Sequence, residues 1–188
     1  MLLIKNAINQ KVEVINMQPN SLKKIVVFGN SASGKSSLAK QLATQYQLAH
    51  LDLDTLAWLP MAAEDLVPQR QSIEVSVANI NAFIKQNQAW VIEGCYSDLL
   101  VHALTKCSEV IFMNLPIELC IENAKHRPWE PHKYNSKAAQ DANLGMLIDW
   151  IAQYDQRTDT FSKSAHQKLY DEFTGKKTQY INNQQVSL

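Results

Sequence analysis

The amino-acid sequence carries no excess of charge of either sign. Its 18 Lys and Arg residues balance 18 Asp and Glu residues, so the formal net charge is zero with neutral His. A general nucleic-acid-binding surface requires a basic excess, so this composition gives little support to DNA binding. The apolar runs are also far shorter than the ~20 residues that span a bilayer as a helix. We therefore expect neither a nucleic acid nor a membrane as a partner.

Secretion signals and paired cysteines are missing as well. Lys5 and Asn6 interrupt the apolar start of the chain, and no stretch typical of a cleavage site follows. The cysteines, Cys95, Cys107 and Cys120, are odd in number and have no C-x-x-C spacing. We expect reduced thiols that pack as small apolar groups in a cytoplasmic protein.

The length of 188 residues predicts one domain with a core large enough to fold alone. Residues 1–22 are interpreted as an N-terminal extension, because Pro19-Asn20-Ser21 breaks the pattern ahead of the first buried run. No function is assigned to this extension. Residues 23–188 are predicted to form the domain itself.

One segment of eight residues has the pattern G-x-x-x-x-G-K-S, which is the phosphate-binding P-loop. Its residues are Gly29, Asn30, Ser31, Ala32, Ser33, Gly34, Lys35 and Ser36. A β-branched run at 24–28 precedes it, and a helical pattern follows from Ser37. Glycines let backbone N–H groups point at phosphate oxygens, at a helix N-terminus that favours negative charge. We predict nucleotide binding by residues 29–37, with Lys35 on the β- and γ-phosphates and the Ser36 hydroxyl on Mg²⁺.

Strands and helices alternate after the P-loop. Further strands are predicted at 48–52, 90–93, 109–114 and 176–181, and helices at 69–86, 116–127 and from 136 onward. This order predicts an α/β protein with the three-layer P-loop NTPase fold, in which helices cover both faces of a parallel sheet of about five strands. Ligands of such sheets bind beyond the carboxyl ends of the strands, which selects the polar residues that matter.

Acidic residues follow two of the predicted strands. Asp52 and Asp54 end the second strand, and Glu93 ends the third, so all three are expected at the edge that carries the P-loop. Asp52 and Glu93 are candidates to hold the water shell of Mg²⁺. Asp54 or Glu93 would position the acceptor hydroxyl in a kinase. The alternative for each acid is that it caps the following helix.

Arg127 is expected at the end of a helix, ahead of a proline-broken segment at 128–136 that mixes cationic and aromatic side chains. We interpret residues 128–136 as a lid that closes over nucleotide and excludes water, with an ordinary surface loop as the alternative. Arg127 would stabilise charge on the transferred phosphoryl group or stack on adenine. Arg157 is either an auxiliary cation or the partner of Asp155 or Asp159.

These motifs resemble small P-loop kinases of the shikimate kinase and adenylate kinase type. In shikimate kinase a D-x-D motif after the second strand places one acid near Mg²⁺ and the next on the substrate hydroxyl, as Asp52 and Asp54 would be here. The segments 50–58 and 90–97 are similar to H-L-D-x-D/L-x-W and W-V-I-D/E-G-x-Y-S in bacterial adenylate-kinase-like ATPases, some of them labelled topology modulation proteins. The resemblance covers residues 23–182 and implies ATP and Mg²⁺ as ligands.

The chain departs from these kinases on the acceptor side. Adenylate kinases follow their Asp-Gly with Phe-Pro-Arg, whose arginine grips the acceptor phosphate, whereas Cys95-Tyr96-Ser97 stands at that place here. The glycine triplet of shikimate kinase is also absent. Arg70 and Lys85 are the only cations in the sequence between Asp54 and Glu93, which is few for binding a phosphorylated acceptor.

Aromatic residues near the predicted acceptor side offer a different surface. Trp58, Tyr96 and Trp129 are candidates to wall a pocket for a flat or apolar acceptor, with a role as core aromatics as the alternative. We therefore predict a protein that binds ATP and Mg²⁺ and transfers the γ-phosphoryl group to a small molecule, either a nucleoside monophosphate or a hydroxylated metabolite. The alternative is a slow ATPase or a nucleotide-dependent switch that acts through a protein partner. The predicted catalytic and substrate residues are Lys35, Asp54, Glu93, Arg127, Trp58 and Tyr96.

Overall fold

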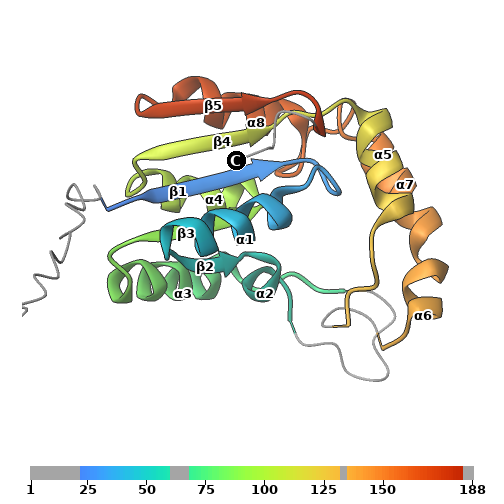
Figure 1. Cartoon of the computed structure of the whole chain (residues 1–188), viewed down its shortest axis with the longest axis horizontal. Helices are drawn as coiled ribbons and strands as arrows, with labels where there is room; N and C mark the ends of the chain where they lie inside the picture. The colour runs from blue at the N-terminus through green and yellow to red at the C-terminus, as the bar shows by residue number, and fades with distance from the viewer. Residues whose placement is uncertain (1–21, 60–67, 132–134, 184–188) are drawn as a thin grey trace, which may run out of the picture.

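The computed structural model describes residues 22–59, 68–131 and 135–183. Within these ranges the chain forms a five-stranded parallel sheet whose strand order is β2-β3-β1-β4-β5 (Figure 1). The strands are β1 (Lys24–Gly29), β2 (Ala49–Asp52), β3 (Trp90–Gly94), β4 (Glu109–Met113) and β5 (Lys176–Tyr180). The predicted α/β class and parallel sheet are confirmed. The predicted extension lies outside the described residues except for Leu22, as do residues 132–134 of the predicted lid.

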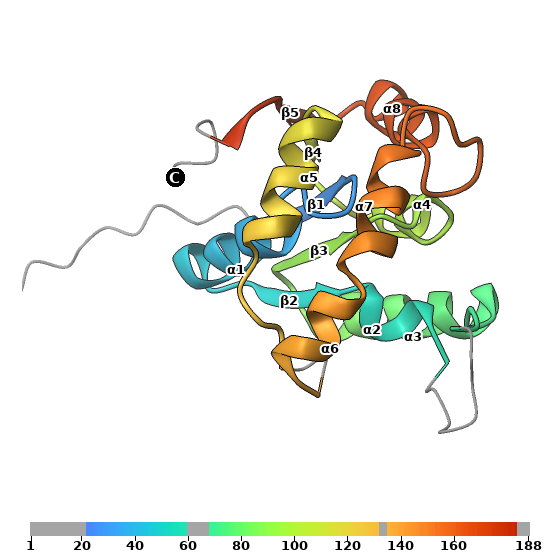
Figure 2. The same ribbon diagram turned by 90° about the vertical axis from the view of Figure 1, so that its right-hand side faces the viewer.

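Helices cover both faces of the sheet and stand beyond its carboxyl edge. They are α1 (Lys35–Tyr46), α2 (Asp54–Ala57), α3 (Ile73–Gln86), α4 (Ser97–Leu104), α5 (Ile117–His126), α6 (Lys137–Ala142), α7 (Leu144–Ala152) and α8 (Lys163–Glu172). Figure 1 shows the strands running toward the end where α5, α6 and α7 stand. Figure 2 looks onto that end, with the chain between α5 and α6 passing in front of β2. This edge is where the predicted ligand site belongs.

Alternation along the central strands builds two apolar layers. Val26 and Phe28 of β1 pack on one face with residues of α3, α4 and α8. Ile25 and Val27 pack on the other face with residues of α1, α5 and α7. Because successive side chains of a strand point to opposite faces, a strand buried on both faces is apolar throughout. The continuous apolar runs that predicted β1 and β4 have this cause.

Helix boundaries differ from the predictions in places that have local causes. The helix predicted at 69–86 begins at Ile73, because the Ser72 hydroxyl caps it by accepting from Val75 N. Arg70 instead forms an isolated antiparallel bridge with Trp58. The helix predicted from 136 onward is two helices, α6 and α7, which meet at Asn143. Helices α2, α4 and α8 lie in stretches where no helix was predicted.

The structure also describes the state of the cysteines and the character of the helices. Cys95, Cys107 and Cys120 are all free thiols, and Cys120 is buried in the layer beside α1. None of the helices in the described ranges combines the length and the apolar character that crossing a bilayer requires.

The first glycine of the P-loop is fixed by a close approach of β1 to β4. Gly29 pairs with Met113 in the register of the two strands, and its φ is +148°. A Cβ built on Gly29 would lie 2.4 Å from the carbonyl oxygen of Met113, which is backbone and cannot move aside. Only glycine therefore fits where the strand turns into the loop.

We expect Gly29→Ala to destabilise the fold by at least about 2 kcal/mol, because it adds a backbone clash to an unfavourable φ. Gly145→Ala is the control, since a Cβ at Gly145 in α7 meets nothing within 4 Å. Replacing a helical glycine at an open position should stabilise by up to about 1 kcal/mol. Urea unfolding of both variants measures the difference, and equal free energies of unfolding would contradict this explanation of Gly29.

Candidate active site

The P-loop connects β1 to α1. Gly34 is the N-cap of α1 in the left-handed region, with φ 90°, and no side chain caps the helix. The Ser33 hydroxyl is buried and has no hydrogen-bond partner in the described part of the chain. An uncapped helix N-terminus and an unsatisfied buried hydroxyl are both met by phosphate oxygens. The loop therefore fits a phosphate group.

Lys35 and Asn30 organise the interior of the loop. Lys35 is only 8% exposed, and its Nζ donates to the Asn30 carbonyl oxygen at 2.8 Å. The Asn30 side chain accepts from Ser31 N at 2.8 Å and donates to the carbonyl oxygen of Ile151 in α7 at 3.2 Å. The ammonium group is thus held inside the loop by neutral oxygen, so a phosphate can replace that contact without breaking an ion pair.

Asp52 and Glu93 are brought together by the pairing of β2 with β3. The two residues are direct partners in the register. Asp54 N donates to Asp52 Oδ1 at 2.9 Å, so Asp52 also caps the start of α2, which was the alternative for this acid. The three predicted acids therefore meet at one edge of the sheet, and the expectation that they lie together is met.

Glu93 is a buried carboxylic acid beside other charges. Its exposed fraction is 1%, and Oε1 has no hydrogen-bond partner among the described residues. Burial raises the pKa of Glu93 to about 7, and Asp52 adds to the rise, while Lys35 and the Ser36 hydroxyl oppose it. Glu93 is therefore close to half protonated at neutral pH, which matches the requirement for exchanging a proton near pH 7.

The residues expected to hold Mg²⁺ lie at this place. Ser36 and Asp52 both interact with Glu93, and the unsatisfied Glu93 Oε1 is an oxygen that a coordinated water can meet. Across the described ranges no group of three or more His, Cys, Asp and Glu side chains could hold a metal by itself. The donor set fits an ion that takes a hydroxyl, waters and phosphate oxygens, as Mg²⁺ does.

Asp54 is held by a chain of two hydrogen bonds. The Tyr96 hydroxyl donates to Asp54 Oδ1 at 2.6 Å, and Trp58 Nε1 donates to the Tyr96 oxygen at 2.7 Å. Tyr96 is 2% exposed, so its ring lies in the core and only its hydroxyl reaches the acid. Trp58 packs edge-on against Tyr96. The two aromatics predicted as pocket walls therefore lie behind Asp54, and they can affect a ligand through its carboxylate.

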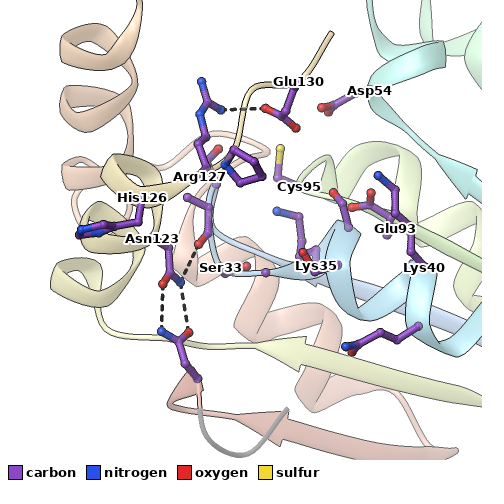
Figure 3. Close-up of a pocket in the computed structure, with 18 of the residues that line it drawn as sticks. Ser33, Lys35, Lys40, Asp54, Glu93, Cys95, Asn123, His126, Arg127 and Glu130 are labelled. Atoms are coloured by element: carbon purple, nitrogen blue, oxygen red, sulfur yellow. Dashed lines mark hydrogen bonds and ion pairs between the residues drawn. The ribbon is translucent and has the colours of Figure 1, made fainter. Parts of the chain in front are cut away.

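One large cavity joins these residues to the segment after α5 (Figure 3). Its volume is about 1500 Å³, against about 300–1,000 Å³ for a pocket that takes one drug-sized ligand. The space is enough for two substrates at once. The lining includes P-loop residues 31–37, the acids Asp54 and Glu93, Cys95, and residues 126–131.

The segment after α5 lies along the cavity and is attached to α6. Arg127 Nη1 is 3.1 Å from Glu130 Oε2. Gln140 of α6 is buried, donates to the Pro128 carbonyl oxygen at 3.1 Å and accepts from Glu130 N at 2.9 Å. Trp129 is 45% exposed at the cavity. The first part of the predicted lid is therefore a defined structure over the phosphate-binding loop.

The sequence offers no signal for the roles that Asn123 and His166 have near the site. Asn123 Nδ2 donates to the Ala32 carbonyl oxygen of the P-loop at 3.0 Å. Burial lowers the pKa of His166 to about 4, so its ring is neutral. His166 Nε2 is 3.0 Å from the Cys95 carbonyl oxygen and Nδ1 is 2.8 Å from the Tyr154 hydroxyl, which requires Nε2 to donate and Nδ1 to accept. Only the folded chain brings these groups to the site.

Arg157 does not line the cavity in the described structure. Its Nε is 3.2 Å from Asp159 Oδ1, and its guanidinium lies 3.5 Å from the centre of the Trp150 ring. The expected ion pair with Asp159 is confirmed.

The strand order, the glycine loop and the helix that starts at Lys35 give this chain the P-loop NTPase fold. No protein-family model matches the chain. An uncharacterized protein of Bacillus subtilis (strain 168), YqaC, is 22% identical over 138 residues, which are 71% of this chain and 73% of that protein.

The solved structures similar to this chain include two kinases. One is a gluconokinase from Sinorhizobium meliloti 1021, with a TM-score of 0.43 and 18% identity over 76% of this chain and 81% of the other. The second is a sugar kinase from Janibacter sp. HTCC2649, with a TM-score of 0.46 and 11% identity over 87% and 89% of the two chains.

Glu93 makes a prediction for the pH dependence of stability. Its pKa in the folded state, about 7, lies above the ordinary 4.5, so the folded protein is favoured while Glu93 is protonated and loses that contribution as pH rises through about 7. We compare the free energy of unfolding of Glu93→Gln with that of the wild type, in the absence of nucleotide and Mg²⁺. The difference should change in favour of Glu93→Gln by on the order of 2–3 kcal/mol between pH 4.5 and pH 8.

Urea unfolding across this pH range measures the effect. The control is Glu172→Gln, which removes an exposed carboxylate on α8 that faces Lys168. If the Glu93→Gln and wild-type curves stay parallel with pH, the buried acid does not have the raised pKa.

Proposed function

We propose that this protein binds ATP with Mg²⁺ and transfers the γ-phosphoryl group to a hydroxyl group of a small molecule. The observation that carries the proposal is the P-loop in its strand, loop and helix setting, with Lys35 inside it and an uncapped helix N-terminus behind it. A cavity large enough for two substrates adds to this support. The three free cysteines favour the cytoplasm as the place of action.

On the donor side the residues hold the triphosphate. Backbone N–H groups at the start of α1 bind phosphate oxygens, and the Lys35 ammonium moves from the Asn30 carbonyl to the β- and γ-phosphates. Ser36, and Asp52 through water, would hold Mg²⁺, which neutralises charge on the phosphates when bound. Ser33 donates its buried hydroxyl to the same anion.

On the acceptor side Asp54 orients the attacking hydroxyl. The acceptor oxygen forms a bond to the γ-phosphorus, the bond from that phosphorus to the bridging oxygen breaks, and ADP leaves. The proton of the hydroxyl passes to the Asp54 carboxylate, which Tyr96 holds in place. Glu93, close to half protonated, is the second acid able to exchange this proton.

Arg127 and the segment that follows it close the cavity. The guanidinium lies at the cavity wall beside Glu130 and would stabilise negative charge that develops on the transferred group. Closure of residues 128–136 over the bound nucleotide would exclude water and so favour transfer to the acceptor over hydrolysis.

Nucleotide binding is tested by thermal unfolding. ATP with Mg²⁺ at ~100 times its dissociation constant should stabilise the wild type by ~2.7 kcal/mol. For a domain of this length that is a rise of roughly 5–10 °C in the melting temperature. Lys35→Ala should lose most of the shift, because its ammonium binds the phosphates, while Lys168→Ala, an exposed residue of α8 that does not line the cavity, should keep it. A wild type that no nucleotide stabilises would refute the proposal.

The two aspartates are expected to separate donor from acceptor. ADP formation is measured with a panel of nucleoside monophosphates and hydroxylated metabolites. Asp54→Asn should abolish acceptor-dependent ADP formation, by at least ~10²-fold, with nearly unchanged ATP affinity. Asp52→Asn should weaken Mg²⁺-dependent use of ATP whatever the acceptor, and Asp149→Asn on the exposed side of α7 serves as control.

Two results would speak against this division of roles. Loss of ATP binding in Asp54→Asn as severe as in Lys35→Ala would place Asp54 on the donor side. ADP formation at one low rate, unaffected by every acceptor, would favour a slow ATPase or a nucleotide-dependent switch over a kinase.

A further inference from the structure

Arg70 is turned into the protein and is already bound there. Its Nε donates to the Ala57 carbonyl oxygen at 3.1 Å, and its Nη2 donates to Asp98 Oδ2 at 3.1 Å. The guanidinium also lies over the rings of Tyr96 and Phe161, 4.9 Å and 5.4 Å from their centres. Since a guanidinium has its donors in one rigid fork, these contacts hold Arg70 away from the residues that line the cavity.

Lys85 lies at the opposite edge of the sheet. It is in the last turn of α3, which leads into the first residue of β3, Trp90. The cavity opens at the other edge, where β3 ends at Gly94. The two cations that the sequence offers between Asp54 and Glu93 are therefore both excluded from the acceptor side.

The cations that do line the cavity have other positions. In the described part of the chain the lining Lys and Arg residues are Lys35, Lys40 and Arg127. Lys35 belongs to the P-loop, and Lys40 lies about 7.5 Å farther along α1 at the helical rise per residue. Arg127 faces Glu130, which offsets its charge. Lys35 is thus assigned to the donor, Arg127 already has an acidic neighbour, and Lys40 borders the cavity from α1, farther along the helix than the P-loop.

Carboxylates line the same space. Asp54, Glu93 and Glu130 all border the cavity, and Figure 3 shows Asp54 and Glu130 pointing into the same part of it. A phosphate or carboxylate placed there would face the like charge of Asp54, and Glu130 cancels the positive charge of Arg127 that would otherwise attract it. Hydroxyl groups, by contrast, can donate to both acids.

We propose that the acceptor is a hydroxylated molecule without a phosphate or carboxylate group, whose hydroxyls donate to Asp54 and Glu130. The inference rests on the kinase function proposed above and narrows it, since it excludes nucleoside monophosphates as acceptors. Discrimination against anions comes from Asp54, from the neutralisation of Arg127 by Glu130 and from the withdrawal of Arg70.

A dinucleotide tests the acceptor side whether or not an acceptor is known. Diadenosine pentaphosphate joins the groups of ATP to a second, anionic nucleotide end, and its affinity is compared with that of ATP by calorimetry with Mg²⁺ present. We expect the two dissociation constants to agree within about threefold, because the second end meets acids. Binding tenfold or more tighter than ATP would overturn the inference and leave ATP binding, and with it the proposed function, intact.

Removing the charge of one cavity-lining acid provides a second test of the inference. Glu130→Gln removes one acid and releases Arg127, so the affinity for the dinucleotide relative to ATP should rise at least about fivefold. Glu172→Gln, a carboxylate of α8 that faces Lys168, should leave the ratio unchanged. An unchanged ratio in Glu130→Gln would contradict the role given to this acid.

Matched acceptors provide the third arm, with ADP formation as the measurement. Adenosine is compared with adenosine monophosphate, and glucose with gluconate and glucose 6-phosphate. The uncharged member of a pair that is turned over should have a kcat/KM at least about tenfold above its anionic counterpart. Preference for the anionic member would overturn the inference, and if no member is turned over the dinucleotide arm decides. Failure of ATP itself to bind would instead refute the proposed function.

Discussion

The parallel register of β1 with its neighbours is the constraint on which the whole site depends. Val27 of β1 pairs with Glu93, Gly29 pairs with Met113, and Glu93 in turn pairs with Asp52. A slip of one residue would turn every side chain of a strand to the other face. Glu93 would then leave Lys35 and enter the apolar layer beside α3. The apolar alternation that buries both faces of the sheet therefore also places the charged groups.

The charged groups at this edge are costly to the fold, and their surroundings limit that cost. Glu93 is buried beside Asp52, which raises its pKa, while Lys35 and Ser36 act in the opposite direction. Lys35 is itself satisfied by a backbone carbonyl rather than by an acid. Groups kept in such unfavourable states without a ligand are typical of sites where a ligand completes the set of contacts.

Periodicity and spacing were enough to predict the fold, because each central strand is a continuous apolar run and the P-loop octet marks its own location. The same reasoning placed Asp52, Asp54 and Glu93 at one edge. It could not assign roles that depend on contacts between distant residues. The sequence shows that Tyr96 is aromatic, but it does not show where the hydroxyl lies. The fold brings that hydroxyl to Asp54, which is 42 positions away in the sequence.

The predicted helix boundaries were wrong in places for a related reason. Helix α4 is short, and its first turn is held by a tertiary contact, the bond from Asp98 N to the Thr160 hydroxyl. Arg70, which does not line the cavity, also shows how contacts between distant residues decide the position of a side chain. Its sequence position suggested a cation near the acceptor, whereas its partner Asp98 lies 28 positions away and directs it elsewhere.

Helix α7 ties the end of the chain to its beginning. The Ile151 carbonyl receives the Asn30 amide of the P-loop, and Tyr154, just beyond the helix, reaches the Cys95 carbonyl through His166. A fragment that stopped before α7 would contain the entire glycine-rich octet and all three strand-end acids. It would still lack the groups that hold Asn30 and the Cys95 carbonyl in place. The glycine-rich octet near the start of the sequence thus gains its contact with Ile151 only once α7 has been made.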